Sequence, residues 1–243
     1  MEASWGFSCW IAHGGKNILF YTGSDGIVLS RNITKLAFDA AEIDLMMISH
    51  QHWDHTGGIY FVLDASRNLR VLIPRSFSAH FKADMKRYGA ELMEADGGQE
   101  ISPGFYTTGD LHGSMQEQAA LVKTSAGIVV ITGCAHPGIV QMAQTAKNIF
   151  PQDDLALVMG GFHLLDSGDG EIREIVARFT STLKAIQILT CDFGLGMSNR
   201  RITVSTCGLA PQIVQLGKDI CINLAVSLNA HDDETRSHLM PVN

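Results

Sequence analysis

The apolar positions of this chain fall into short runs separated by turn-forming and polar residues. Residues 45–48, Leu-Met-Met-Ile, form one continuous run of this kind, which is typical of a strand buried on both faces. Similar runs, several of them rich in β-branched residues, predict the remaining strands. We expect strands at residues 7–12, 17–22, 45–48, 71–73, 91–95, 119–123, 128–132, 155–159 and 185–190.

Between these runs lie longer segments whose apolar residues recur at helical spacing. They predict helices at residues 27–38, 57–65, 76–88, 139–150 and 171–183. Residues 97–109 are rich in glycine and are expected to form turns. Beyond Cys191 the pattern weakens, and a last hairpin is expected at 213–216 and 220–224.

Strands outnumber helices, and the helices fall between groups of strands. This order favours an α/β fold with two mixed sheets and helices on their outer faces. The 243 residues are enough to bury a sizeable core. We expect a single domain over residues 1–243, with residues 1–6 and 230–243 frayed.

Composition narrows the function. The formal net charge is −7 and the pI is about 5.7, which argues against nucleic acid as a partner and favours a small-molecule substrate. Five cysteines without a C-x-x-C pair indicate a reducing compartment and a cytoplasmic location. No apolar run approaches the roughly 18–20 residues that span a bilayer, so no membrane is expected. Oligomeric state is not indicated.

The candidate chemistry is concentrated directly after the buried run at 45–48. His50, His52, Asp54 and His55 fall within six residues. Imidazoles and carboxylates are zinc ligands, and alternation in extended chain directs His50 and His52 to the same side. Asp54 and His55 can turn toward a second metal where the chain curls into a helix. The alternative, a histidine-rich surface loop, is disfavoured by four potential ligands at this spacing directly after a buried strand.

The pattern H-x-H-x-D-H after an apolar strand resembles the signature of the metallo-β-lactamase superfamily. The segments Thr-Gly-Cys-Ala-His at 132–136 and Gly-Gly-Phe-His at 160–163 are similar to the subfamily of ribofuranosyl-aminobenzene phosphate synthase, a dihydropterin-linked enzyme. Its members are often labelled only as metal-dependent hydrolases. The resemblance runs from about residue 7 to residue 191. It implies a four-layer αβ/βα sandwich with metals at one edge between two sheets.

The resemblance also implies roles for individual residues. His50, His52 and His136 would bind a first metal. Asp54 and His55 would bind a second, with His163 either a ligand there or a hydrogen-bonded neighbour of the ligands.

In this subfamily a histidine in a C-H-C-T-G segment closes the second site, and Asp192 stands in its place. Asp192 either substitutes as a ligand or marks a rearranged segment with a weak second site.

Four further residues near the predicted metal site have their own interpretations. Tyr21 stands where the superfamily has an aspartate that supports the metal-binding loop, so that support is expected to be missing. Cys134 is interpreted as a small buried thiol in a turn, although it could face the same side as His136. Trp53 either lines a substrate pocket or packs the loop. His112 is interpreted as an exposed loop histidine, with substrate contact as the alternative.

These features together predict a hydrolase that uses two zinc ions and a metal-bound hydroxide. Asp54 would position the hydroxide and accept its proton, and His163 or His112 would stabilise developing charge. The resemblance favours a small, phosphorylated or heterocyclic substrate. Iron and manganese are also compatible with histidine-rich ligation, and an iron-loaded redox member is a further possibility. The alternative is a metal- or ligand-binding member with an impaired second site and little turnover.

Overall fold

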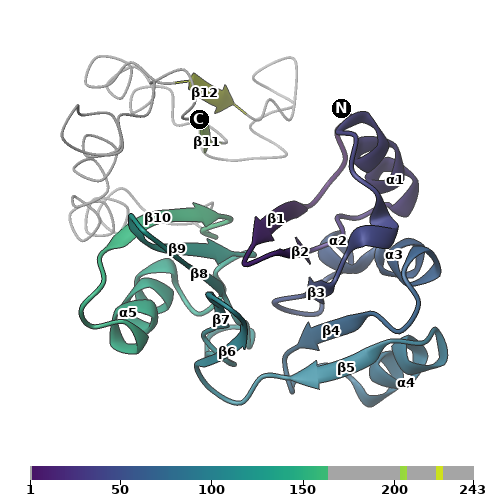
Figure 1. Cartoon of the computed structure of the whole chain (residues 1–243). Coiled ribbons are helices and arrows are strands. Elements are labelled where there is room, and N and C mark those ends of the chain that lie inside the picture. The colour runs from purple at the N-terminus through teal and green to yellow at the C-terminus, as the bar shows by residue number, and fades with distance from the viewer. Residues whose placement is uncertain (1, 164–202, 207–222, 227–243) are drawn as a thin grey trace, which may run out of the picture. The chain divides into compact units, whose positions relative to one another are not determined.

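A computed structural model describes residues 2–163, 203–206 and 223–226 of the chain (Figure 1). The chain divides into two compact units, residues 1–162 and 163–243, which are described separately. The interpretation of residues 1–243 as one domain stays a prediction. The expected elements at 171–183, 185–190 and 213–216 lie outside the described residues, as does Asp192.

The first unit contains two five-stranded mixed sheets. In the first sheet, order β1-β2-β3-β4-β5, only the β1–β2 pair is antiparallel. In the second, order β10-β9-β8-β7-β6, only the β9–β10 pair is parallel. The strands are β1 (Cys9–His13), β2 (Lys16–Phe20), β3 (Leu45–Met47), β4 (Arg70–Ile73), β5 (Glu91–Glu94), β6 (Gln99–Ser102), β7 (Phe105–Thr107), β8 (Ala120–Thr124), β9 (Gly127–Thr132) and β10 (Leu155–Gly160).

Helices cover the outer faces of both sheets. Figure 1 shows α1, α3 and α4 beside the first sheet and α5 beside the second. The helices are α1 (Gly26–Lys35), η1 (Ala40–Glu42), α2 (Trp53–Thr56), α3 (Ile59–Ala65), α4 (Ala79–Arg87) and α5 (Ile139–Ile149). This arrangement confirms the predicted α/β class with two mixed sheets and outer helices.

Local chemistry explains where two of these helices begin and end. The Asp25 carboxylate accepts hydrogen bonds from the backbone of Ile27 and Val28, so α1 begins at its expected place. It ends earlier than predicted because Ala37 adopts a left-handed conformation, with φ of 58°. Helix α4 begins at residue 79, not 76, because Ser78 is its N-cap.

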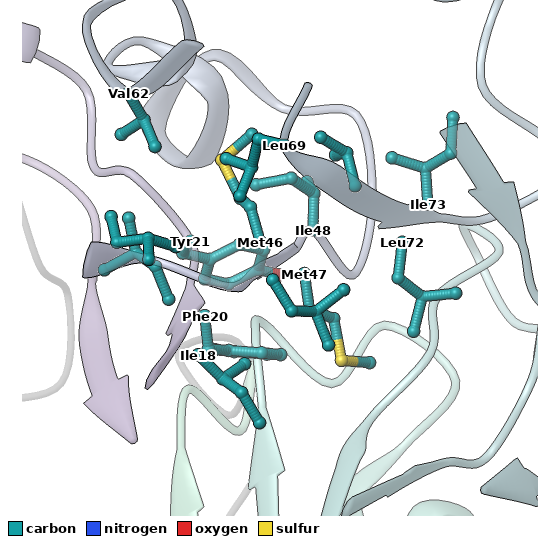
Figure 2. Close-up of a cluster of buried hydrophobic side chains, with 14 of the residues drawn as sticks. Ile18, Phe20, Tyr21, Met46, Met47, Ile48, Val62, Leu69, Leu72 and Ile73 are labelled. Carbon is teal, nitrogen blue, oxygen red and sulfur yellow. The ribbon is translucent and has the colours of Figure 1, made fainter. Parts of the chain in front are cut away.

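Strand β3 lies at the centre of the first unit's core. Its three residues are fully buried, as expected for a strand covered on both faces. Figure 2 shows Val62 and Leu69 on one side of the buried β3 side chains, and Ile18 and Phe20 on the other. The core therefore holds rigidly the point from which the histidine-rich loop departs.

One expectation about regular structure needs correction. Residues 97–109 were expected to form only turns, but they contain the edge strands β6 and β7, whose apolar residues Ile101 and Phe105 are buried. Glycine-rich turns between the strands obscured this alternation. In the second unit, β12 (Asn223–Val226) pairs in parallel with β11 (Thr203–Thr206). The hairpin expected at 213–216 and 220–224 stays a prediction, because its first strand lies outside the described residues. Within the described part of the chain, no helix is long and apolar enough to cross a membrane.

Candidate metal centre

Three loops meet at one edge of the two sheets. The first follows β2 and carries Tyr21, the second follows β3 and carries the histidine-rich segment, and the third follows β9 and carries residues 133–136. The sheets are joined here by Gln118, whose backbone N–H donates to Ser49 O at 3.1 Å and whose side chain donates to Ile48 O at 3.0 Å. Residues distant in sequence are therefore brought together.

His50, His52 and His136, which we call the histidine triad, converge at this edge. Each offers one ring nitrogen, and these nitrogens lie within 4.8 Å of one another. Nε2 of His50 lies 3.0 Å from Nδ1 of His52, as the predicted alternation requires. His50 is buried, whereas the other two are partly exposed. The triad is therefore both held by the core and open to solvent.

A second group of donors surrounds His55, which lies in the short helix α2. Nε2 of His55 is 3.0 Å from Cys134 Sγ and 3.3 Å from Asp54 Oδ2. Burial lowers the pKa of His55 to about 4, although the Asp54 carboxylate opposes this shift. The imidazole is therefore neutral at pH 7, as a metal ligand must be. Cys134 is only half-buried and contacts a polar group, so its interpretation as a buried turn thiol is incomplete.

The expectation that Tyr21 removes support from the metal-binding loop is wrong. The Tyr21 hydroxyl lies 2.8 Å from Nδ1 of His50 and also hydrogen-bonds the hydroxyl of Ser49. The Tyr21 ring stacks on His55, with centroids 4.1 Å apart. Burial, followed by the nearby Glu117 charge, raises the pKa of Tyr21 well above its ordinary value, so the phenol stays neutral. Tyr21 thus supports both histidines.

Glu117 is a site residue that sequence reasoning missed. It is fully buried, and its carboxylate accepts hydrogen bonds from the backbone N–H groups of residues 133–136 at 2.8–3.2 Å. It also accepts a bond of 3.0 Å from Ser49 Oγ. Burial raises the pKa of Glu117, while these hydrogen bonds oppose the shift. One carboxylate therefore fixes the loop that carries His136. Because Glu117 stands between Gln116 and Gln118, the sequence gives no signal of this role.

Close backbone packing fixes the remaining geometry. A Cβ on Gly133 would lie 1.5 Å from the Tyr21 hydroxyl, so only glycine fits there. A Cβ on Gly57 would lie 2.0 Å from Ser24 O, so a side chain is excluded there as well. Thr22 donates through both N–H and Oγ1 to His55 O, at 3.0 and 2.8 Å, and so holds α2 in place.

The other predicted site residues have different outcomes. His163 is the first residue of the second unit and has a left-handed φ of 51°; its roles as ligand and charge stabiliser stay predictions. The same holds for Asp192, which lies outside the described residues. His112 is exposed and lies 3.2 Å from the Gln116 amide. Trp53 is 67% exposed, so it does not pack the loop.

The donor set fits a transition-metal cation. Three imidazoles around one position form a ligand set typical of catalytic zinc, and sulfur, nitrogen and carboxylate oxygen around His55 suit the same class of metal. Nδ1 of His55 is buried and, within the described residues, has no hydrogen-bond partner. The site thus contains the residues that a metal requires, on a framework of hydrogen bonds that fixes them.

Comparison with known proteins identifies the family. The sequence model of the metallo-beta-lactamase superfamily matches residues 6–142, more than half of the chain. The chain belongs to the metallo-beta-lactamase superfamily. The matched residues include the histidine triad, Asp54, His55, Tyr21 and Glu117, whereas His163 and Asp192 fall beyond them.

Individual relatives agree with this assignment. The crystal structure of Tm1679, a metal-dependent hydrolase of the beta-lactamase superfamily, is similar with a TM-score of 0.65 and 23% identity, covering 95% of this chain and 94% of that one. This likeness confirms the predicted fold. The 7,8-dihydropterin-6-methyl-4-(beta-D-ribofuranosyl)-aminobenzene-5'-phosphate synthase of Methanocaldococcus jannaschii is 25% identical over 218 residues, 72% of either chain. The resemblance drawn from the two glycine-containing segments is thereby confirmed.

A different relative matches only a short segment. The dual-specificity RNA methyltransferase RlmN of Syntrophus aciditrophicus is 61% identical over 70 residues, which are 29% of this chain and 20% of the methyltransferase. The chain thus spans about a fifth of that relative's length. The match leaves most of the chain, and most of the methyltransferase, unaccounted for.

Proposed function

We propose that the chain is a metal-dependent hydrolase whose first cation is bound by the histidine triad. The observation that carries this proposal is the convergence of three imidazole nitrogens within 4.8 Å at a solvent-accessible edge of the fold. We propose zinc as the cation, with iron and manganese as the alternatives that such ligands allow. A second zinc is proposed beside Asp54 and His55, with His163 and Asp192 as its further candidate ligands.

When bound, such cations polarise a carbonyl or phosphoryl oxygen and lower the pKa of a water toward about 7. The chain's own residues have separate tasks. Tyr21 and Glu117 orient His50 and the loop carrying His136. Asp54, whose side chain is 14% exposed, accepts a proton from the attacking water at its carboxylate. His163 or His112 is proposed to donate a hydrogen bond to the developing charge.

The proposed substrate is a small phosphorylated or heterocyclic molecule. The Methanocaldococcus jannaschii relative supports this class, since its name describes a dihydropterin joined to a ribofuranosyl phosphate. The net charge of −7 supports a small-molecule substrate over a nucleic acid. We also propose a cytoplasmic location. Because that relative is a synthase, hydrolysis itself has to be tested.

The test compares metal-loaded protein with matched variants on phosphodiester, lactone and thioester substrates. The protein is stripped with a chelator and reloaded with zinc, iron or manganese. We expect turnover by the wild type and by His80→Ala, whose imidazole is 88% exposed on α4, and loss of turnover in His52→Ala. If the metal-loaded wild type hydrolyses none of these substrates faster than His52→Ala, the hydrolase proposal is wrong. The alternative, a metal- or ligand-binding member of the superfamily with little turnover, then replaces the hydrolase proposal.

A further inference from the structure

Cys134 has no task in the proposed hydrolase, yet its sulfur is placed among metal-binding groups. The Sγ atom lies 3.0 Å from Nε2 of His55, and Asp54 Oδ2 lies 3.3 Å from the same nitrogen. The sulfur and the carboxylate oxygen thus flank the same imidazole nitrogen. These are three of the ligand types found in zinc sites.

His50 is close enough to join this group, but its nitrogens are already engaged. His50, His55 and Cys134 offer donor atoms within 4.8 Å of one another. However, Nε2 of His50 faces His52, and Nδ1 faces the Tyr21 hydroxyl. Since each imidazole nitrogen binds one cation, His50 belongs to the triad, and the donors left for another cation are those around His55.

The backbone that carries the Cys134 thiol is fixed, like that of His136, by a hydrogen bond to the Glu117 carboxylate. The Cys134 N–H donates to Glu117 Oε1 at 3.0 Å, and Ala135, which follows, adopts a left-handed φ of 58°. A thiol retained only for packing would be expected among apolar neighbours. Cys134 is instead half-buried and faces an imidazole.

We propose that Cys134 is the thiolate ligand of the second cation position, together with Asp54 and His55. The inference rests on the proposed function, because it completes the second metal site of the same enzyme. Binding forms a metal–sulfur bond, and the thiol proton is released to solvent. The soft sulfur selects zinc or a similar transition metal over magnesium or calcium.

Cobalt(II) tests this proposal in the full chain, because a thiolate ligand gives cobalt an intense near-ultraviolet charge-transfer absorption that imidazole and carboxylate do not give. Metal-free protein is titrated with cobalt while the spectrum and the bound metal are recorded. The variants are Cys134→Ser, Cys134→Asp, which keeps an anionic ligand, and the control Cys9→Ser, whose sulfur lies on β1 beside Trp10 O.

We expect the charge-transfer absorption to appear with the second equivalent of cobalt in the wild type and in Cys9→Ser. Both Cys134 variants should lack it, and Cys134→Asp should still bind two cobalt ions. Absorption that survives in a Cys134 variant, or its absence in a wild type holding two ions, would overturn the proposal.

A measurement on the wild type alone guards against a variant that fails to fold. Cobalt should protect Cys134, but not Cys9, from alkylation, as mapped by peptide mass spectrometry; equal alkylation of Cys134 with and without cobalt would overturn the proposal. Hydrolysis is recorded separately on the same samples. Thiolate absorption without turnover would contradict only the hydrolase, whereas turnover without thiolate absorption would contradict only the role of Cys134.

Discussion

The hydroxyl of Tyr21 lies 2.8 Å from Nδ1 of His50, and this contact starts a hydrogen-bond chain that ends on a buried carboxylate. Tyr21 hydrogen-bonds Ser49, and Ser49 Oγ donates to Glu117 Oε1 at 3.0 Å. With Nε2 of His50 directed to a cation, Nδ1 carries the proton and donates to Tyr21. The carboxylate support that an aspartate at position 21 would give directly is thus supplied by Glu117 through two hydroxyls.

Removing the hydroxyl of Tyr21 should weaken metal binding without removing a ligand. Tyr21→Phe keeps the ring that stacks on His55 but removes the nearer of the two hydroxyls at Nδ1 of His50, the other being Ser49 Oγ at 3.1 Å. We expect zinc affinity to fall by roughly 10–100-fold, the usual effect of losing a residue that orients a ligand. Competition with a chromophoric chelator measures this. The control is Tyr88→Phe, which changes an exposed tyrosine after α4. Equal zinc affinities in the two variants would contradict the role of the Tyr21 hydroxyl in supporting His50.

Neutralising Glu117 should lower both stability and metal affinity. Glu117→Gln replaces one acceptor oxygen by an amide that cannot accept from the His136 N–H, so buried donors lose their partner. We expect the free energy of unfolding to fall by about 1–3 kcal/mol. Urea denaturation compares this variant with Glu91→Gln, an exposed glutamate on β5. A Glu117→Gln protein as stable as the control would show that the carboxylate does not hold the loop.

Adding one methyl group at Gly133 should displace Tyr21. The new Cβ would lie 1.5 Å from the Tyr21 hydroxyl and 2.5 Å from Ser49 Oγ, in a site with no room for either to move freely. Overpacking of this kind costs about 1–3 kcal/mol, and zinc affinity should fall as well. The control Gly15→Ala adds the same methyl group with nothing within 4 Å; it carries a left-handed backbone cost that Gly133, whose φ is not positive, does not have. Unchanged zinc affinity in Gly133→Ala would contradict the account.

Truncating Trp53 should affect substrate use but not stability. Its side chain is 67% exposed between two candidate ligands, so little packing is lost in Trp53→Ala. With a substrate hydrolysed by the wild type, we expect KM to rise while the free energy of unfolding changes by less than about 0.5 kcal/mol. Tyr88→Ala is the exposed aromatic control. An unchanged KM would show that Trp53 does not line the substrate site.

The sequence predicted the parts of the site that are close together in the chain. His50 and His52 share a side because extended chain alternates, and the buried run before them located the strand edge. The pairing of this loop with His136 came from resemblance, since residues more than eighty positions apart give no local signal of contact.

The supporting network could not be predicted, for physical reasons. Glu117 reads as an ordinary solvated charge until the backbone places four N–H groups around it. Tyr21 was expected to remove the support that an aspartate gives at this position. A phenol side chain is longer than that of aspartate, however, and the Tyr21 hydroxyl contacts His50 directly. Likewise, the apolar alternation of β6 and β7 was hidden by intervening glycines.

The central claim is that the histidine triad binds a metal, and the zinc affinity of His136→Ala tests it most directly. Affinity and bound zinc are measured for the wild type, His136→Ala and the exposed control His80→Ala. We predict that His136→Ala alone loses one tightly bound zinc, with a fall in affinity beyond the roughly 10–100-fold caused by losing a supporting residue. A His136→Ala protein that binds zinc with the stoichiometry and affinity of the wild type would contradict the account.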